Sequence, residues 1–345
     1  MTLAFGIASL GDWLAHPHTG VRIPEEQRFR EMVEEGLLAE RLGATSVHYG
    51  EHHFTDYVLS SPPILMMAVA AQTTRIRLST AATLLPHLDP VRVAEDYGTI
   101  DVLSNGRVEL CGGRGVYQSH YDQFGQNFDD SEEMMLESVA LLRRLWTESS
   151  VTWTGRFRSP LTDVDVHPKP VQRPHPPIWL SASSLASAER AVAARCPIVI
   201  PTVSTGPDVA GQIARHFRAQ WRQAGHPDNE CRVTLHLHNY VGAGTKDEAI
   251  AFFAPFQSNY LKWVLREVRN YDGPLPPHMN DLGEPHSQAV VGDVDYNIEE
   301  INRRIDLCEG VDRLLVQTNH GGMRFCDVEA SYSRFARDVL PRLRE

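Results

Sequence analysis

Hydrophobic and polar residues follow two patterns that take turns along the chain. Short runs that are almost entirely apolar precede longer stretches in which apolar residues recur every third or fourth position. The first pattern is typical of buried strands and the second of amphipathic helices, and their alternation predicts parallel strands joined by crossover helices. Strand-like runs lie near residues 5, 47, 78, 110, 179, 199, 235 and 315. Eight such units predict a closed (β/α)8 TIM barrel of the α/β class.

The stretch from Pro24 to Gly43 shows the helical pattern most clearly. Proline and the two acids Glu25 and Glu26 stand where the first turn of a helix favours them. Gly43 stands where a helix favours a left-handed terminal residue. The short apolar run that follows is therefore expected to be the second strand of the barrel.

The alternation is interrupted after the fourth and the seventh strand. We expect one domain over residues 1–345 with insertions at roughly 116–176 and 242–293. The first begins with a polar and aromatic segment up to residue 130, predicted to be a loop, and ends in a proline-rich extended stretch. A doubly wound open sheet is the alternative, which is disfavoured because no G-x-G-x-x-G follows the first strand.

Charge and cysteine content narrow the functional classes. The net charge of −11 and the scattered basic residues disfavour a nucleic-acid or anionic-membrane partner. Five widely spaced cysteines argue against a disulfide framework and a thiolate zinc site. The N-terminus lacks the features of a signal peptide, and no apolar run approaches the ~18 residues of a membrane span. We therefore expect a cytoplasmic protein.

Residues suited to chemistry follow four consecutive strands. In a TIM barrel these positions share one mouth, where active sites lie. The four segments, in chain order, are Glu51-His52-His53-Phe54, Ser79-Thr80-Ala81-Ala82, Gly112-Gly113-Arg114-Gly115 and Ser181 to Ser187.

Each segment has a functional and an ordinary interpretation. One imidazole facing a cavity could act as an acid or base near neutral pH, or both histidines could be loop residues. Small residues after the third strand could admit a flat molecule or fill a tapering barrel. The glycine-flanked Arg114 suits a phosphate but could be solvated. The serine cluster suits a phosphate at a helix N-terminus, or one serine caps the helix. Together the segments favour a flat, phosphate-bearing cofactor beside a histidine.

His236 and His238 lie on one face of the seventh strand. They could begin a metal site, as in a metal-dependent barrel hydrolase, but further ligands would be required. We therefore predict no metal.

These motifs resemble those of the bacterial luciferase-like flavin monooxygenases, and the luciferase alpha chain in particular. The resemblance covers nearly the whole chain and also includes Pro90-x-Arg92-x-Ala94-Glu95 and Leu103-Ser104-Asn105-Gly106-Arg107. It implies that His52 is catalytic, that His53 and Glu51 shape the site, and that a cis peptide joins Ala81 to Ala82 beneath the isoalloxazine. The cofactor-binding residues that we assign on this basis are Ala81, Ala82, Gly113, Arg114, Tyr117, Ser181, Ser183, Ser184 and Ser187.

The resemblance also implies the reaction. Reduced FMN from a separate flavin reductase would react with O2 to form a C4a-peroxyflavin, which oxygenates a small aldehyde-like or ketone-like substrate. A homodimer is expected. The alternatives are a non-catalytic flavin-binding or dimer-partner protein and an oxidoreductase that depends on the deazaflavin F420.

One segment departs from the family pattern. The family usually places a second phosphate-binding arginine at the start of the helix after the Phe124-Gly125 landmark. Here that segment reads Asp129-Asp130-Ser131-Glu132-Glu133. An acidic residue near a phosphate dianion is unfavourable unless its side chain points away.

Overall fold

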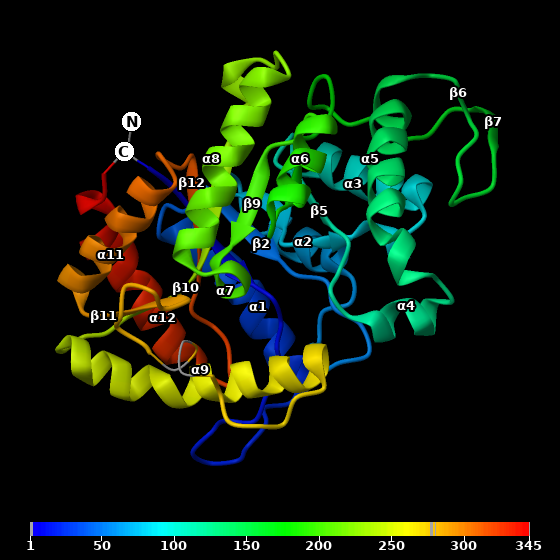
Figure 1. The fold of residues 1–345 in the computed structure, drawn as a ribbon. Helices are drawn as coiled ribbons and strands as arrows, with labels where there is room; N and C mark the ends of the chain where they lie inside the picture. Colours follow the sequence, from blue (N-terminus) through cyan, green and yellow to red (C-terminus); the bar gives the residue numbers. More distant parts are fainter. Residues whose placement is uncertain (1–2, 277–278, 280, 345) are drawn as a thin grey trace.

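The computed structural model describes residues 3–276, 279 and 281–344, and its centre is a parallel β-barrel (Figure 1). The barrel strands are β1 (Ala4–Ser9), β2 (Ser46–Tyr49), β3 (Arg77–Thr80), β5 (Leu110–Gly113), β8 (Ile178–Ser181), β9 (Ile198–Pro201), β10 (Val233–Val241) and β12 (Arg313–Gln317). They neighbour one another in the order β3-β2-β1-β12-β10-β9-β8-β5. The barrel closes where Leu78 of β3 bridges to Val108, just before β5. The predicted TIM barrel is confirmed, with all eight predicted strands in it.

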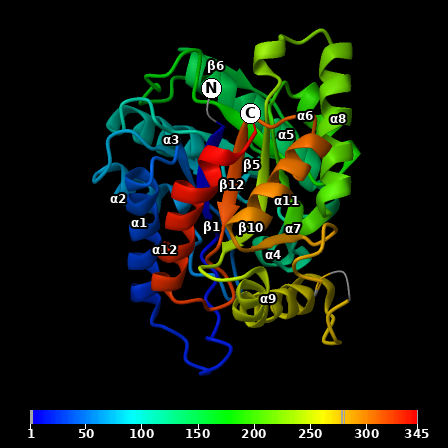
Figure 2. The same cartoon turned by 90° about the vertical axis from the view of Figure 1, so that its left-hand side faces the viewer.

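Helices surround the barrel on its outer side (Figure 2). The main ones are α1 (Glu25–Arg41), α2 (Pro62–Ala70), α3 (Pro90–Leu103), α5 (Ser131–Thr147), α6 (Leu185–Ala193), α8 (Pro207–Gln223), α11 (Val294–Leu307) and α12 (Phe325–Arg334). Their apolar faces pack on the strands, so the core lies between the two layers. The chain ends lie close together at one end of the barrel, away from α9 (Lys246–Arg269).

The segment from 116 to 130 is not the loop that the sequence predicts. It holds α4 (Gln118–Phe124) and a 3₁₀ turn, Phe128–Asp130. His120 and Tyr121 are buried, and the Tyr117 and His120 rings stack 4.6 Å apart. Aromatic rings and imidazoles bury this helix, and a pattern based on aliphatic residues does not detect them. The proline-rich stretch that follows contains an antiparallel hairpin of β6 (Val151–Trp153) and β7 (Leu161–Val164).

Two further parallel strands of the described chain were not predicted. β11 (Ala289–Gly292) pairs with His238–Val241, the part of β10 that extends beyond its pairing with β9. Because β10 is nine residues long, its outer end offers backbone groups that β11 satisfies. A shorter strand, β4 (Thr83–Leu84), pairs with the end of β5.

Charged residues close the N-terminal end of the barrel interior. Arg313 donates to Glu109 with both Nη atoms at 3.0 Å, and Arg77 donates to the other oxygen at 2.5 Å. The Arg313 guanidinium also lies 4.8 Å from the centre of the Trp179 ring. Burial alone would raise the pKa of Glu109, but Arg313 and Arg77 outweigh it and lower this pKa to about 2.

Within the described residues, none of the helices combines the length and the apolar character that a membrane crossing requires.

Candidate active site

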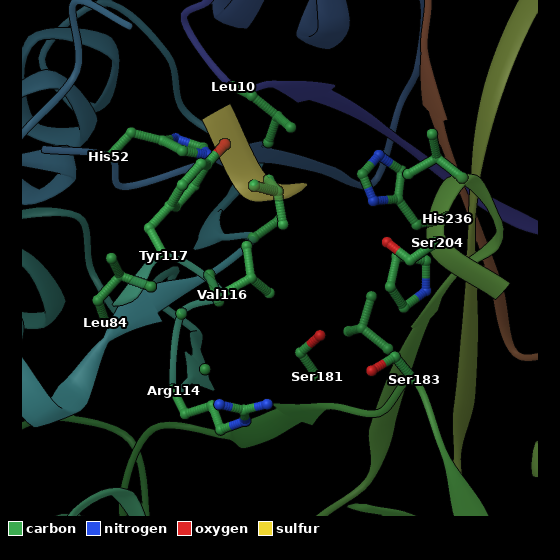
Figure 3. Close-up of a pocket in the computed structure, with 18 of the residues that line it drawn as sticks. Leu10, His52, Leu84, Arg114, Val116, Tyr117, Ser181, Ser183, Ser204 and His236 are labelled. Carbon is green, nitrogen blue, oxygen red and sulfur yellow. The ribbon is translucent and has the colours of Figure 1, made fainter. Parts of the chain in front are cut away.

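A cavity of about 440 Å³ opens at the C-terminal ends of the strands (Figure 3). This volume falls within the range of small-molecule sites. Ten of the twelve site residues assigned from the sequence line it: Glu51, His52, Ala81, Ala82, Gly113, Arg114, Tyr117, Ser181, Ser183 and Ser187. His53 and Ser184 are not among its lining residues. α9 runs across the mouth and contributes Leu261, Val264, Leu265 and Val268 to the wall.

The segment after β2 turns its three polar side chains in different directions. His52 faces the cavity beside Tyr117 (Figure 3). Glu51 is buried and accepts hydrogen bonds from the Leu84 backbone amide at 3.1 Å and from His53 Nε2 at 2.9 Å. His53 is thereby held against Glu51. The structure separates the two histidines by direction, as adjacent residues require.

His52 is held as a neutral imidazole. Its ring stacks on Tyr57 with the ring centres 3.6 Å apart, and its backbone amide donates to the Leu59 carbonyl at 3.0 Å. Burial, followed by the neighbouring His120 and His53, lowers the pKa of His52 to about 3. Its Nδ1 atom is buried without a hydrogen-bond partner in the described structure. Such an imidazole is uncharged and only weakly basic at neutral pH, so it is suited to orient a reactant through a hydrogen bond.

Small residues form a flat part of the wall between the His52 and Arg114 ends. The peptide bond between Ala81 and Ala82 is cis, which confirms the sequence prediction. A Cβ atom on Gly113 would come within 2.8 Å of the Ala82 Cβ, so a side chain there would crowd this surface. Cys111 lies beside it, and burial raises the pKa of its thiol to about 12.

Arg114, Ser181 and Ser183 gather at one end of the cavity, away from His52 (Figure 3). Ser187 also lines this end, at the start of α6. The Ser184 side chain accepts from the Ser187 amide at 3.1 Å, and Ser187 Oγ in turn accepts from the Ser184 amide at 2.9 Å. These two hydrogen bonds form a capping box, which satisfies two backbone amides at the start of the helix. Of the clustered serines, Ser184 and Ser187 therefore cap the helix.

Glu132 and Arg190 complete the end of the cavity that holds Arg114. Glu132 Oε1 lies 2.5 Å from Arg190 Nη2 and 3.7 Å from Arg114 Nε. All three side chains line the cavity and are about one-third exposed. The Glu132 carboxylate therefore faces the two arginines and does not point away from them. A phosphate bound at this end would lie beside an acidic side chain, which is unfavourable.

The part of the cavity away from Arg114 combines apolar residues with neutral polar groups. Tyr57 and Tyr260 join hydroxyl to hydroxyl at 2.9 Å. His236 faces the cavity from β10, hydrogen-bonded through Nε2 to Gln317 at 3.0 Å, and burial lowers its pKa to about 4. This part suits an uncharged substrate with some polar character.

The sequence profile of the luciferase-like monooxygenases matches residues 3–303. The chain belongs to the luciferase-like monooxygenase family. The predicted resemblance to that family is confirmed, and so is the prediction that the protein is an enzyme.

Two relatives illustrate the family. The oxygenase component of the flavin-dependent trigonelline monooxygenase of Acinetobacter baylyi is 24% identical over 93% of this chain and 91% of its own length. The alkanal monooxygenase alpha chain of the Kryptophanaron alfredi symbiont is 22% identical, covering 94% and 95%.

Three solved structures share the fold of this luciferase-like monooxygenase. The monooxygenase RslO1 of Streptomyces bottropensis has a TM-score of 0.83 at 25% identity, covering 98% of this chain and 99% of its own. The FMN complex of the oxygenating constituent of 3,6-diketocamphane monooxygenase from Pseudomonas putida has a TM-score of 0.79 at 18% identity, covering 100% and 99%. An F420-dependent secondary alcohol dehydrogenase has a TM-score of 0.75 at 18% identity, covering all of both chains.

His236 and His238 have different surroundings in the described structure, with His236 at the cavity and His238 inside the barrel. His238 packs against the His320 ring, 4.3 Å between centres, inside the barrel. In the part of the chain that the structure describes, no group of three or more His, Cys, Asp or Glu side chains could hold a metal ion.

Several residues of this luciferase-like monooxygenase site escaped the sequence analysis. Arg190 stands three residues after Ser187, almost one helical turn, so its spacing could have indicated it. Tyr57 and Tyr260 are separated by about two hundred residues and carried no local signal. The cavity residues of α9 lie in the segment predicted to be the second insertion, whose path the pattern did not predict.

Proposed function

We propose that this luciferase-like monooxygenase uses reduced FMN and O2 to oxygenate a small, largely apolar substrate of the aldehyde or ketone class. The observation that carries this proposal is one cavity with arginines and serines at one end, small residues along a flat wall and a neutral histidine at the other. These features fit the phosphate, the ring system and the reacting edge of a flavin in that order.

The residues present fit FMN by their chemistry. Guanidinium and hydroxyl groups near a helix N-terminus suit a phosphate, and Arg114, Ser183 and Ser187 would supply them. Gly113 and Ala82 would leave room for the flat ring. Reduced FMN, when bound, supplies the electrons that activate O2.

The protein's own groups would control that chemistry. His52, uncharged, would orient the reactant beside Tyr57 through a hydrogen bond. The apolar side of α9 would exclude water from the reacting end. A hydroxyl of the Tyr57–Tyr260 pair would donate a hydrogen bond to a substrate carbonyl. His236, whose Nε2 donates to Gln317, would offer only the acceptor Nδ1.

A separate flavin reductase is the proposed source of reduced FMN. The sequence contains no G-x-G-x-x-G fingerprint for a nicotinamide nucleotide after its first strand. One relative is named as an oxygenase component, which implies a partner for that relative.

The test supplies reduced FMN from an added reductase together with ¹⁸O2 and a panel of alkanals and ketones. We expect one ¹⁸O atom in the product by mass spectrometry, and none when the reductase is omitted. Binding of FMN without ¹⁸O transfer to any panel member would contradict the proposal. Tighter binding of F420 than of FMN would favour the deazaflavin alternative.

We also propose a homodimer that forms through α1, α2 and α3. These neighbouring helices carry exposed apolar side chains, among them Ile64 at 74% and Leu103 at 66% exposure. Light scattering should give twice the chain mass, and Ile64→Lys with Leu103→Lys should give the monomer. Val209→Lys, at an exposed apolar residue on α8, is the control. A monomeric native protein would contradict the proposed dimer.

A further inference from the structure

The two arginines of the proposed phosphate site both face the carboxylate of Glu132. Glu132 Oε1 pairs with Arg190 at 2.5 Å and faces Arg114 Nε at 3.7 Å. The Arg114 guanidinium is further fixed over the Phe128 ring at 4.8 Å, and its Nη1 lies 3.4 Å from Ser131 Oγ. One carboxylate therefore occupies the place between two guanidinium groups.

The two ends of the Glu132–Arg190 pair come from separate helices. Glu132 stands in the first turn of α5, and Arg190 follows Ser187 on α6. The adjacent acids of α5 turn elsewhere, since Glu133 and Asp130 both pair with Arg156, at 2.5 and 2.8 Å. Glu132 is thus the acid of this segment that lines the cavity.

A phosphate dianion and this carboxylate compete for the same donors. Guanidinium groups bind carboxylate and phosphate with the same planar fork. A carboxylate left beside a bound dianion also repels it. In partly solvated surroundings, a unit charge next to a dianion changes affinity by a factor on the order of ten.

We propose that Glu132 is an internal competitor for the flavin phosphate, and that Arg190 becomes the second phosphate-binding arginine when the phosphate displaces Glu132. The inference rests on the proposed function, because it assigns residues to the same flavin site. Arg190 on α6 would take the part that the family usually gives to an arginine at the start of α5. The flavin would accordingly bind as an exchangeable cosubstrate.

The experiment compares FMN with riboflavin, which has the same ring system but no phosphate. Calorimetric titration of Glu132→Gln should show FMN binding on the order of tenfold tighter than in the native protein, with riboflavin affinity unchanged within about twofold. Arg190→Gln should weaken FMN by a similar factor and leave riboflavin unchanged. Glu133→Gln removes the same charge from the neighbouring position and should change neither.

The outcomes separate the inference from the proposed function. Equal shifts for both flavins, or no shift for FMN, in Glu132→Gln would overturn the competitor role of Glu132. Unchanged FMN affinity in Arg190→Gln would overturn the role of Arg190. Native protein that binds neither flavin, oxidised or reduced, would instead contradict the proposed function. Thermal unfolding of each variant checks that the fold is retained.

Discussion

At the scale of single residues, the chemistry of the cavity depends on how burial treats each side chain. His52 loses its charge because its ring is enclosed by Tyr57 and has two other imidazoles nearby. His53, its neighbour in the chain, bonds to Glu51 at 2.9 Å and does not line the cavity. Two adjacent histidines therefore have different surroundings and different proposed roles.

The His52→Ala variant should lose oxygenated product by about a hundredfold or more while retaining FMN affinity, because it removes the imidazole proposed to orient the reactant. His53→Ala is the matched control, and its product yield should fall less. The measurement is product formed per reduced FMN consumed. Unchanged product yield in His52→Ala would contradict the catalytic assignment of His52.

The low pKa of His52 also predicts how its contribution to activity depends on pH. A folded-state pKa of about 3 keeps the imidazole neutral from pH 5 to 8. The ratio of native to His52→Ala activity should therefore stay constant across that range. An inflection of this ratio near pH 6.5, the ordinary value for histidine, would contradict the neutral assignment.

At the scale of elements, α6 shows how one helix start serves stability and binding together. Ser184 and Ser187 satisfy each other's backbone amides, while Ser183 and Ser187 also line the cavity. The clustered serines are thus divided between capping the helix and facing the proposed phosphate.

Ser184→Ala should lower the free energy of unfolding by about 1 kcal/mol, because the first turn of α6 loses its cap. Ser183→Ala should change it by less than about 0.5 kcal/mol, since an exposed serine outside the cap contributes little. Urea unfolding measures both. Equal destabilisation by the two variants would contradict the assignment of Ser184 as the cap.

At the scale of the whole molecule, the barrel keeps its chemistry and its structural charges at opposite ends. The cavity lies at the C-terminal ends of the strands, and the Arg313–Glu109 pair closes the N-terminal end. Both partners of that pair are buried, so each depends on the other.

Arg313→Met should destabilise the protein by about 3–5 kcal/mol, because Glu109 would remain buried without its main partner. Arg337→Met, which removes an exposed ion pair with Asp338, should cost less than about 1 kcal/mol. Chemical denaturation compares the two. If Arg313→Met lowers the free energy of unfolding no more than Arg337→Met does, the buried pair does not contribute measurably to stability.

Because several histidines are buried, we expect the free energy of unfolding to fall in acid. Burial lowers the pKa of His48 to about 3, of His236 to about 4 and of His320 to about 3. Between these values and the unfolded pKa of about 6.5, the unfolded chain binds more protons than the native one. Stability is therefore lost as pH falls below about 6.5, by about 1.4 kcal/mol per pH unit for each such histidine. Burial raises the pKa of Asp12 to about 6. Just below that pH the native state holds a proton on Asp12 that the unfolded chain lacks, so this one group opposes the loss of stability.

The measurement is the unfolding free energy from pH 7 to 5. His48→Gln should reduce the slope by about one proton, and His167→Gln, at a side chain that is 71% exposed, should leave it unchanged. A native slope near zero in this range would contradict the prediction.

The sequence by itself determined the order of strands and helices and the segments at the barrel mouth. Strand and helix patterns depend on neighbouring residues, so they are readable without the fold. Parallel strands bring their C-terminal ends to one edge, which is why Glu51, Ala82, Arg114 and Ser183 could be grouped before their positions were known. The cis peptide was predictable from the family resemblance alone.

Only the tertiary structure decided which of these groups interact and in what state. The Glu132–Arg190 pair joins residues 58 positions apart, and the Tyr57–Tyr260 pair joins residues 203 apart. Distant segments also supply the rings of His53 and His87 that pack on α4, the β10 partner of β11, and the His120 ring near His52. Local periodicity contains no information on such contacts, because they depend on how the barrel closes and how α9 covers its mouth.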